Sequence, residues 1–130
     1  EGGEPNDRFS SYWDDDTEMT YPLILAKIPV KNPWEIFAYL PFGNWNDCPD
    51  TPELMAAAKY WFQQHGAIPA AMSHDELEFE LPTPISKERA MEVAVEQYGF
   101  CPDLDQNEDG SIGSLADVLW QSTVWYFWWD

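Results

Sequence analysis

The sequence DQNEDGSI, near the end of the chain, carries residue types that bind calcium. It matches the start of an EF-hand loop, in which oxygen ligands alternate along the chain and a glycine permits the sharp turn. The predicted side-chain ligands are Asp105, Asn107 and Asp109, and Ser111 would add its main-chain carbonyl. The position of the usual bidentate acid is occupied by Ala116, so the pattern predicts a weak site. The alternative is an acidic turn that caps the next helix.

Cysteine and histidine residues allow a different chemistry, because a histidine that takes a thiol proton creates a nucleophile. The thiols are Cys48 and Cys101, and the possible bases are His65 and His74. No hydrolase motif surrounds them, neither cysteine belongs to a zinc-binding Cys-x-x-Cys pair, and acidic neighbours raise a thiol pKa. The alternative is that both cysteines are reduced, buried and structural. With the polar residues that could orient a base or a substrate, the candidate catalytic residues are Cys48, His65, Asn46 and Asp103.

Carboxylates outside the expected core form a third group. Glu76, Glu78 and Glu80 alternate with apolar residues, so all three are expected to face away from the core. A tryptophan left partly open beside such a face would be an anchor for a partner. The predicted binding residues are therefore Trp45, Glu76, Glu78, Glu80 and Glu108.

Charge is the most unusual bulk property of the chain. Six Lys and Arg residues face 24 Asp and Glu residues, and the formal net charge is −18. Such a surface repels phosphate groups, which argues against nucleic acid and anionic membranes as partners. A basic protein partner is favoured instead. The simpler alternative is that the charge only keeps an aromatic-rich protein in solution.

The size and the cysteine content indicate one domain in a reducing compartment. The 130 residues fit one domain, and two cysteines are too few for a disulfide scaffold. No apolar run is long enough to cross a bilayer. We therefore expect a cytoplasmic protein that has no cofactor apart from the calcium considered above.

Local sequence signals predict the order of the elements. An acidic, flexible lead-in over 1–20 precedes a single domain over 21–130. The domain is expected to begin with a strand at 23–30 and a short helix at 34–40, followed by a helix that is capped by Thr51 and ends near His65, before Gly66. A hairpin of strands at 67–72 and 76–81 comes next, and then a helix that runs from its cap, Ser86, to about Tyr98 and is closed by Gly99. A short helix at 112–119 and an aromatic strand at 123–129 complete the expected order.

This order, β-α-α-β-β-α-α-β, predicts an α+β fold with a mostly antiparallel sheet and helices on one face. The final strand is expected within the sheet, because the tail is the most apolar segment of the chain.

Four segments together resemble a known family: PFGNWNDCP, KYWFQQHGAIPA, EQYGFCPD and the tail QSTVWYFWWD. Over roughly residues 22–130 the chain is similar to the bacterial family catalogued as domain of unknown function 4253, and the tail is the most specific part. In that family the Cys-Pro-Asp segment leads into a Gln and a short Gly-containing turn, whereas here the stretch 104–110 is unusually acidic. The resemblance implies a compact α+β fold. It brings no established activity, substrate or catalytic residue.

Two functions remain open at this point. The first is a non-enzymatic interaction protein, of an immunity type or an accessory type, that binds a basic protein through its acidic face. The second is a small enzyme or ligand-binding domain that uses the loop WNDCPD together with His65. Convergence of Asn46, Cys48, His65 and Asp103 in one cleft would favour the second, whereas an open acidic face with exposed aromatic side chains would favour the first.

Overall fold

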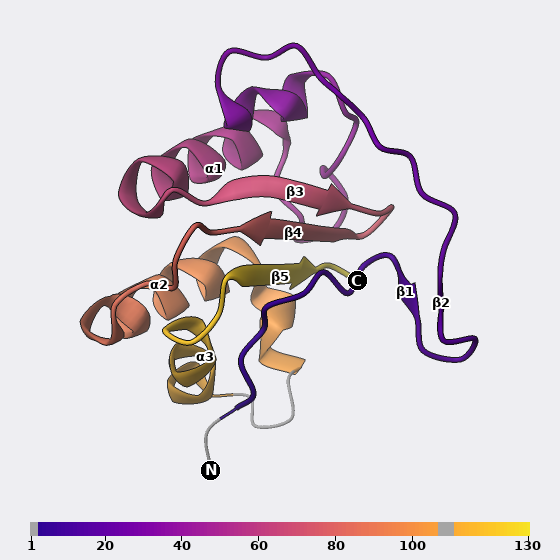
Figure 1. Ribbon diagram of the computed structural model, residues 1–130. Helices are drawn as coiled ribbons and strands as arrows, with labels where there is room; N and C mark the ends of the chain where they lie inside the picture. Colours follow the sequence, from indigo (N-terminus) through magenta and orange to yellow (C-terminus); the bar gives the residue numbers. More distant parts are fainter. Residues whose placement is uncertain (1–2, 107–110) are drawn as a thin grey trace.

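The computed structural model describes residues 3–106 and 111–130, with the main chain alone at 105 and 106. Within this part of the chain lie two small antiparallel sheets (Figure 1). One joins β1 (Trp13–Asp14) to β2 (Met19–Thr20), and the other has the strand order β3-β4-β5. Together with the helices, these antiparallel strands confirm the predicted α+β class.

The three-stranded sheet contains the predicted hairpin and the aromatic tail. The hairpin consists of β3 (Ile68–Met72) and β4 (Glu76–Glu80), with a register shift between Pro69 and Ala71. The tail forms β5 (Val124–Trp128) and pairs along its whole length with β4. β4 is therefore the central strand, and β5 belongs to the sheet, as predicted, at its edge.

Helix α1 (Thr51–His65) has strong local signals at both ends. Asp50 is the N-cap, and it forms a capping box in which its side chain and that of Glu53 each accept a main-chain N–H of the other. The predicted cap, Thr51, is instead the first helical residue. Gly66 ends the helix with a left-handed φ of 73°. The helix is therefore specified locally, apart from a shift of one residue at its start.

Two helices pack against the same face of the sheet. Trp61 of α1 stacks on Phe127 of β5 with the ring centroids 5.5 Å apart and the planes 7° apart. Phe100, from α2 (Lys87–Phe100), meets Phe127 edge-on at 5.0 Å. Both helices therefore cover the inner face of the sheet, where the alternating side chains of β4 and β5 form the core.

Helix α2 is longer than expected. The predicted cap, Ser86, is its N-cap residue, although its side chain forms no cap hydrogen bond. The helix continues through Gly99 and ends before Pro102, which cannot continue the hydrogen-bond pattern. The 3₁₀ helix η2 (Pro102–Gln106) follows, and α3 (Ile112–Leu119) packs against α2 as the predicted short helix.

The chain before α1 differs most from expectation. Residues 23–30 form no strand, and Ile24 and Leu25 are 94% and 101% exposed. The predicted strand is wrong because this run pairs with no other strand, and Pro29 lacks the N–H that a strand ladder needs. The predicted short helix is present as the 3₁₀ helix η1 (Pro33–Ala38).

The lead-in also has structure. It contains β1 and β2, and residues within 3–11 form hydrogen bonds to β4, to β5 and to the residues just before β5. Figure 1 shows this segment passing beside β5 before it reaches β1. The chain itself therefore covers part of the outer face of the sheet, although the division of the chain at residue 20 stays a prediction.

Candidate functional site

The turn between β3 and β4 is an ordered polar cluster. The Ser73 hydroxyl lies 3.0 Å from a carboxylate oxygen of Glu76 and 3.3 Å from one of Asp75, and it accepts the main-chain N–H of Glu76 at 3.1 Å. His74, whose side chain is 89% exposed, places Nε2 3.4 Å from Asp75. Because the histidine points to the carboxylate and not to the serine, this turn does not form a serine nucleophile with its base.

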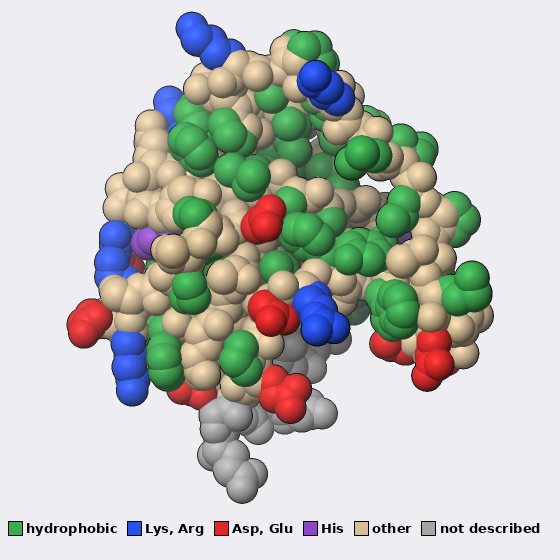
Figure 2. All heavy atoms as spheres, in the orientation of Figure 1, with side chains coloured by type: hydrophobic (Ala, Val, Ile, Leu, Met, Phe, Trp, Pro, Cys, Tyr) green, Lys and Arg blue, Asp and Glu red, His purple; other side chains and the backbone are tan. Residues whose placement is uncertain are grey.

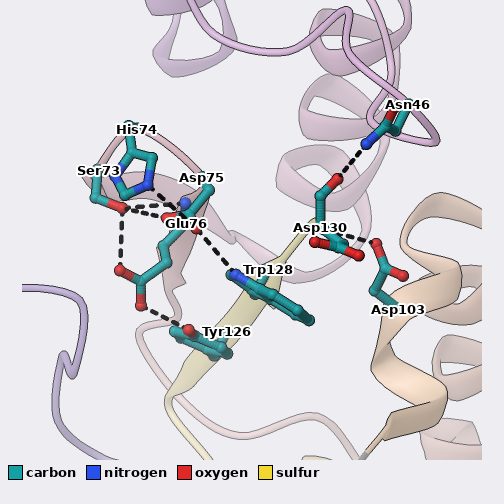
Figure 3. A network of polar contacts seen from close by, with 9 residues as sticks. All are labelled: Asn46, Ser73, His74, Asp75, Glu76, Asp103, Tyr126, Trp128 and Asp130. Atoms are coloured by element: carbon teal, nitrogen blue, oxygen red, sulfur yellow. Dashed lines mark hydrogen bonds and ion pairs between the residues drawn. The ribbon is translucent and has the colours of Figure 1, made fainter.

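Two side chains of β5, the strand that pairs with β4, donate hydrogen bonds to the same carboxylates (Figure 3). The Tyr126 hydroxyl donates to Glu76 at 2.5 Å, and the Trp128 indole N–H donates to Asp75 at 3.0 Å. Burial, followed by the hydrogen bond to Glu76, raises the pKa of Tyr126 well above its usual value. Tyr126 therefore stays a protonated donor, and the two acids are held in place at the end of the sheet.

The β1–β2 hairpin adds a second group of acids. The pKa of the Tyr21 hydroxyl is raised above its usual value, chiefly by the carboxylate of Asp14. Burial contributes next, followed by the carboxylates of Asp16, Glu76 and Asp15. Tyr21 is 50% exposed and Trp13 is 43% exposed. Figure 2 shows carboxylates at the tip of this hairpin, with hydrophobic side chains beside them.

The hairpin and the turn together make what we call the acidic–aromatic surface. Asp14, Asp15, Asp16 and Glu76 all raise the pKa of the Tyr21 hydroxyl, and Glu76 belongs to the β3–β4 turn. The two groups of acids therefore lie within electrostatic range of the same ring. The surface consists of Trp13, Asp14, Asp15, Asp16, Tyr21, Asp75 and Glu76.

The three predicted acids of β4 have different surroundings. Glu80 is exposed, and Glu76 is half-buried and hydrogen-bonded. Glu78 is 0% exposed, so the expectation that its carboxylate lies open at the surface is wrong, whereas its role in binding stays a prediction. The alternation predicted its face correctly, but the main-chain N–H groups of Ser10 and Ser11 cover the carboxylate.

Three of the four predicted catalytic residues belong to one end of the molecule, but His65 does not. Asn46 donates its amide to the main-chain oxygen of Asp130 at 2.7 Å, and the Asp130 N–H donates to Asp103 at 3.0 Å (Figure 3). Cys48 precedes α1, whereas His65 is its last residue. A helix of 15 residues is roughly 22 Å long. The predicted pair of Cys48 and His65 is therefore not brought together.

Both cysteines are free and buried. Burial, and secondarily the nearby Cys101 thiol, raises the pKa of Cys48 to about 12. Burial likewise raises the pKa of Cys101 to about 12, and its thiol donates to the main-chain oxygen of Trp128 at 3.1 Å. Both thiols are therefore protonated at neutral pH, which is the opposite of an activated nucleophile.

His65 lies beside a separate hollow of about 220 Å³ at the far end of α1. Burial, followed by the charge of Arg89, lowers the pKa of His65, so the ring is neutral at neutral pH. Its Nε2 atom is buried and has no hydrogen-bond partner among the described residues, and its ring meets that of Trp125 edge-on at 5.8 Å. The hollow is lined by Gln64, His65, Thr83, Pro84 and Ile85.

The predicted calcium loop falls largely outside the described residues. Asn107 and Asp109 lie outside them, as does the predicted binding residue Glu108, and only the main chain of Asp105 is described. Ser111 is described, and its hydroxyl accepts the N–H of Ser114 at 3.1 Å as the N-cap of α3. Ser111 therefore has the capping role that the alternative interpretation gave to this turn.

Several further observations bear on the kind of site. Among residues 3–106 and 111–130, no group of three or more His, Cys, Asp or Glu side chains is arranged to hold a metal ion. In the same part of the chain, every helix is too short or too polar to cross a membrane. Trp45, the predicted anchor, is half-buried and packs edge-on against Phe42 at 5.2 Å.

Sequence reasoning missed the acids of the β1–β2 hairpin. The run Asp14, Asp15, Asp16 beside Trp13 was visible, but it was assigned to a flexible lead-in. An aromatic residue directly before a block of acids was the available signal. The contribution of Glu76 to the same surface depends on contacts between distant parts of the chain, which local patterns do not indicate.

Comparison with known proteins gives a family without an activity. The family model described as "Domain of unknown function (DUF4253)" matches residues 24–130. No curated protein and no solved structure matches the chain.

Proposed function

We propose that this chain, which belongs to the DUF4253 family, is a non-enzymatic protein that binds a basic protein partner on its acidic–aromatic surface. The observation that supports the proposal is that carboxylates of the β1–β2 hairpin and Glu76 of the β3–β4 turn act on the same exposed residue, Tyr21. An immunity-type or accessory role, in which the chain occupies a surface of another protein, accords with such a site.

The chemistry of this surface suits lysine and arginine side chains. A carboxylate can accept two hydrogen bonds from one guanidinium group, and an aromatic face attracts a cation. Trp13 and Tyr21 are both exposed by about half and stand beside Asp14 and its neighbours. Tryptophan and tyrosine are enriched among the residues that dominate protein interfaces. These features support a partner that brings basic side chains to this surface.

The partner is also expected to carry apolar side chains. Met19, Leu23, Ile24 and Leu25 are all exposed along the segment that leaves the hairpin. An exposed apolar strip beside polar residues is typical of a protein-binding surface. We therefore infer a partner segment in which basic and apolar residues occur together.

The surroundings of the candidate catalytic residues favour binding over catalysis. The Cys48 thiol is protonated at neutral pH, and α1 separates it from His65. The alternative, a small enzyme or ligand-binding domain that uses the 45–50 loop with His65, would need these residues in one cleft. Free thiols accord with a reducing compartment, so the proposal includes a cytoplasmic location.

A matched pair of charge reversals tests the proposal. In the first variant, Asp15→Lys and Asp16→Lys change the acidic–aromatic surface. In the second, Glu88→Lys and Glu92→Lys make the same change of net charge on α2, which packs against the inner face of the sheet. Affinity capture from the native host lysate, followed by titration of the purified partner, should show loss of a basic protein with the first variant alone. Equal loss with both variants, or capture of acidic proteins, would contradict the proposal.

A further inference from the structure

The N-terminal segment over residues 3–12, which we call the strap, is fastened to the beginning of β5. The main-chain oxygen of Asn6 accepts the N–H groups of Thr123 at 3.1 Å and Val124 at 3.0 Å. The N–H of Asn6 donates to the Ser122 hydroxyl at 2.8 Å. Ser122 is itself buried, so this end of the strap closes over a polar side chain at the edge of the sheet.

The other fastening point is the buried carboxylate of β4. Glu78 accepts the N–H of Ser11 at 2.7 Å and the N–H of Ser10 at 3.0 and 3.2 Å. Both donors belong to the main chain. The two donors lie at the start of a turn, in which the Trp13 N–H donates to the main-chain oxygen of Ser10 at 3.1 Å. Glu78 therefore holds main-chain donors and not a particular side chain, so other donors, such as basic side chains, can take their place.

The strap covers the middle residue of a row of acids. Side chains alternate along a strand, so Glu76, Glu78 and Glu80 share the outer face of β4. Tyr126 lies opposite Glu78, and Trp128 lies opposite Glu76 on β5. Glu76 belongs to the acidic–aromatic surface, but with the strap in place Glu78 is hidden, so Glu80 is not joined to that surface.

The strap itself contributes little to the core. Of residues 3–12, all of which the structure describes, Ser11 alone is buried. None of them belongs to the hydrophobic core cluster. The match to the family model begins at residue 24, so the strap lies outside the family domain. Polar main-chain contacts therefore hold the strap, and no side chain of the core cluster comes from it.

We propose that the strap is a releasable cover, latched by Glu78, whose departure extends the partner-binding surface along β4. This inference rests on the proposed function, because it names how the same surface is regulated. A partner that supplies basic side chains replaces the strap on Glu78. Once the strap has left, Glu76, Glu78 and Glu80 form one acidic row.

Two pairs of substitutions separate the latch from other effects. Ser10→Pro with Ser11→Pro removes both N–H donors and leaves every residue of the sheet unchanged. Ser10→Ala with Ser11→Ala removes the same hydroxyl groups and keeps both donors.

Hydrogen exchange of the strap amides is the first measurement. The amide of Asn6 donates to the Ser122 hydroxyl, and that of Trp13 donates to the main-chain oxygen of Ser10. In the Pro variant, these two amides should exchange at least about tenfold faster than in the Ala variant, which corresponds to roughly 1.4 kcal/mol. The amide of Trp61 in α1 should be equally protected in both, which shows that the Pro variant is folded. Equal exchange of the Asn6 and Trp13 amides in the two variants would overturn the proposal that Glu78 holds the strap in place.

Binding of a basic probe is the second measurement. The probe is a peptide of alternating arginine and leucine residues, titrated against wild type and both variants. The Pro variant should bind it severalfold more tightly than the Ala variant. Equal or weaker binding by the Pro variant would overturn the proposal that the strap covers part of the binding surface. A probe that binds none of the three proteins would overturn the proposed function, and the exchange data distinguish that failure from failure of the latch.

Discussion

Replacement of Glu78 by alanine should destabilise the protein far more than the same change at Glu80. The two residues lie on the same strand, face the same side and carry the same charge. Glu78 is fully buried and accepts main-chain N–H groups from Ser10 and Ser11, whereas Glu80 is exposed. Comparing the two variants therefore removes the effect of net charge and isolates the contacts of the buried carboxylate.

The magnitude follows from the contacts. A hydrogen bond to a charged group contributes roughly 1.5–3 kcal/mol, and Glu78 bonds to two N–H donors. Water can hydrate the freed N–H groups in the variant, so we expect Glu78→Ala to lower the free energy of unfolding by about 2–3 kcal/mol. Glu80→Ala should stay within about 0.5 kcal/mol of wild type.

Urea unfolding followed by tryptophan fluorescence measures these differences. The chain has eight tryptophans, and Trp61 and Trp125 are in the core, so the signal reports loss of packing. For a domain of this size, a change of about 2–3 kcal/mol lowers Tm by roughly 7–11 °C. Equal effects of Glu78→Ala and Glu80→Ala would refute the reasoning that the strap contacts stabilise the fold.

The other predictions concern thiols, pH and the tail. Cys48 and Cys101, with pKa values raised to about 12, should resist iodoacetamide at neutral pH; alkylation within minutes in the folded protein would contradict this. Burial lowers the pKa of His65, so the folded state binds this proton less tightly and stability falls as pH drops below the ordinary value of 6.5. Thermal melts from pH 7.5 to 5.5 should show a smaller loss in His65→Gln than in the control His74→Gln. Deletion of 123–130, which removes Phe127, should abolish cooperative unfolding by circular dichroism.

Local signals predicted the elements whose ends are specified by neighbouring residues. The start of α1 depends on Pro52 and Glu53, and its end depends on Gly66, all within a few residues of the helix. The alternation of Glu76–Glu80 predicted β4 because one face of that strand is buried. Such features require no knowledge of distant contacts, and the structure follows them closely.

The run at 23–30 shows where local patterns are insufficient. Its apolar composition is typical of a strand, but a strand also needs a neighbour to pair with. The run could in principle pair with the free edge of β5, but Asn6 and the Cys101 thiol already form hydrogen bonds along part of that edge. Ile24 and Leu25 consequently stay exposed, and the sequence contains no local sign of that outcome.

Glu78 shows the same limit for the site. The alternation assigned its face correctly, but burial depends on what covers that face. Its partners, Ser10 and Ser11, lie 68 and 67 residues away in the sequence. A carboxylate on an outward face is ordinarily solvated, so the local pattern favoured exposure. The acids at 14–16 were likewise visible in the sequence, but their proximity to Glu76 depends on the fold.

The salt dependence of association tests the central claim most directly. Stopped-flow mixing measures the association rate of the arginine–leucine peptide, or of the captured partner, between about 20 and 200 mM salt. The account predicts a steep fall with salt for wild type, because the acidic field steers the encounter. At low salt, Asp15→Lys with Asp16→Lys should slow association severalfold without loss of thermal stability, whereas Glu88→Lys with Glu92→Lys should stay close to wild type. A wild-type rate indifferent to salt, or equal rates in the two variants, would contradict the claim that the acidic–aromatic surface receives a basic partner.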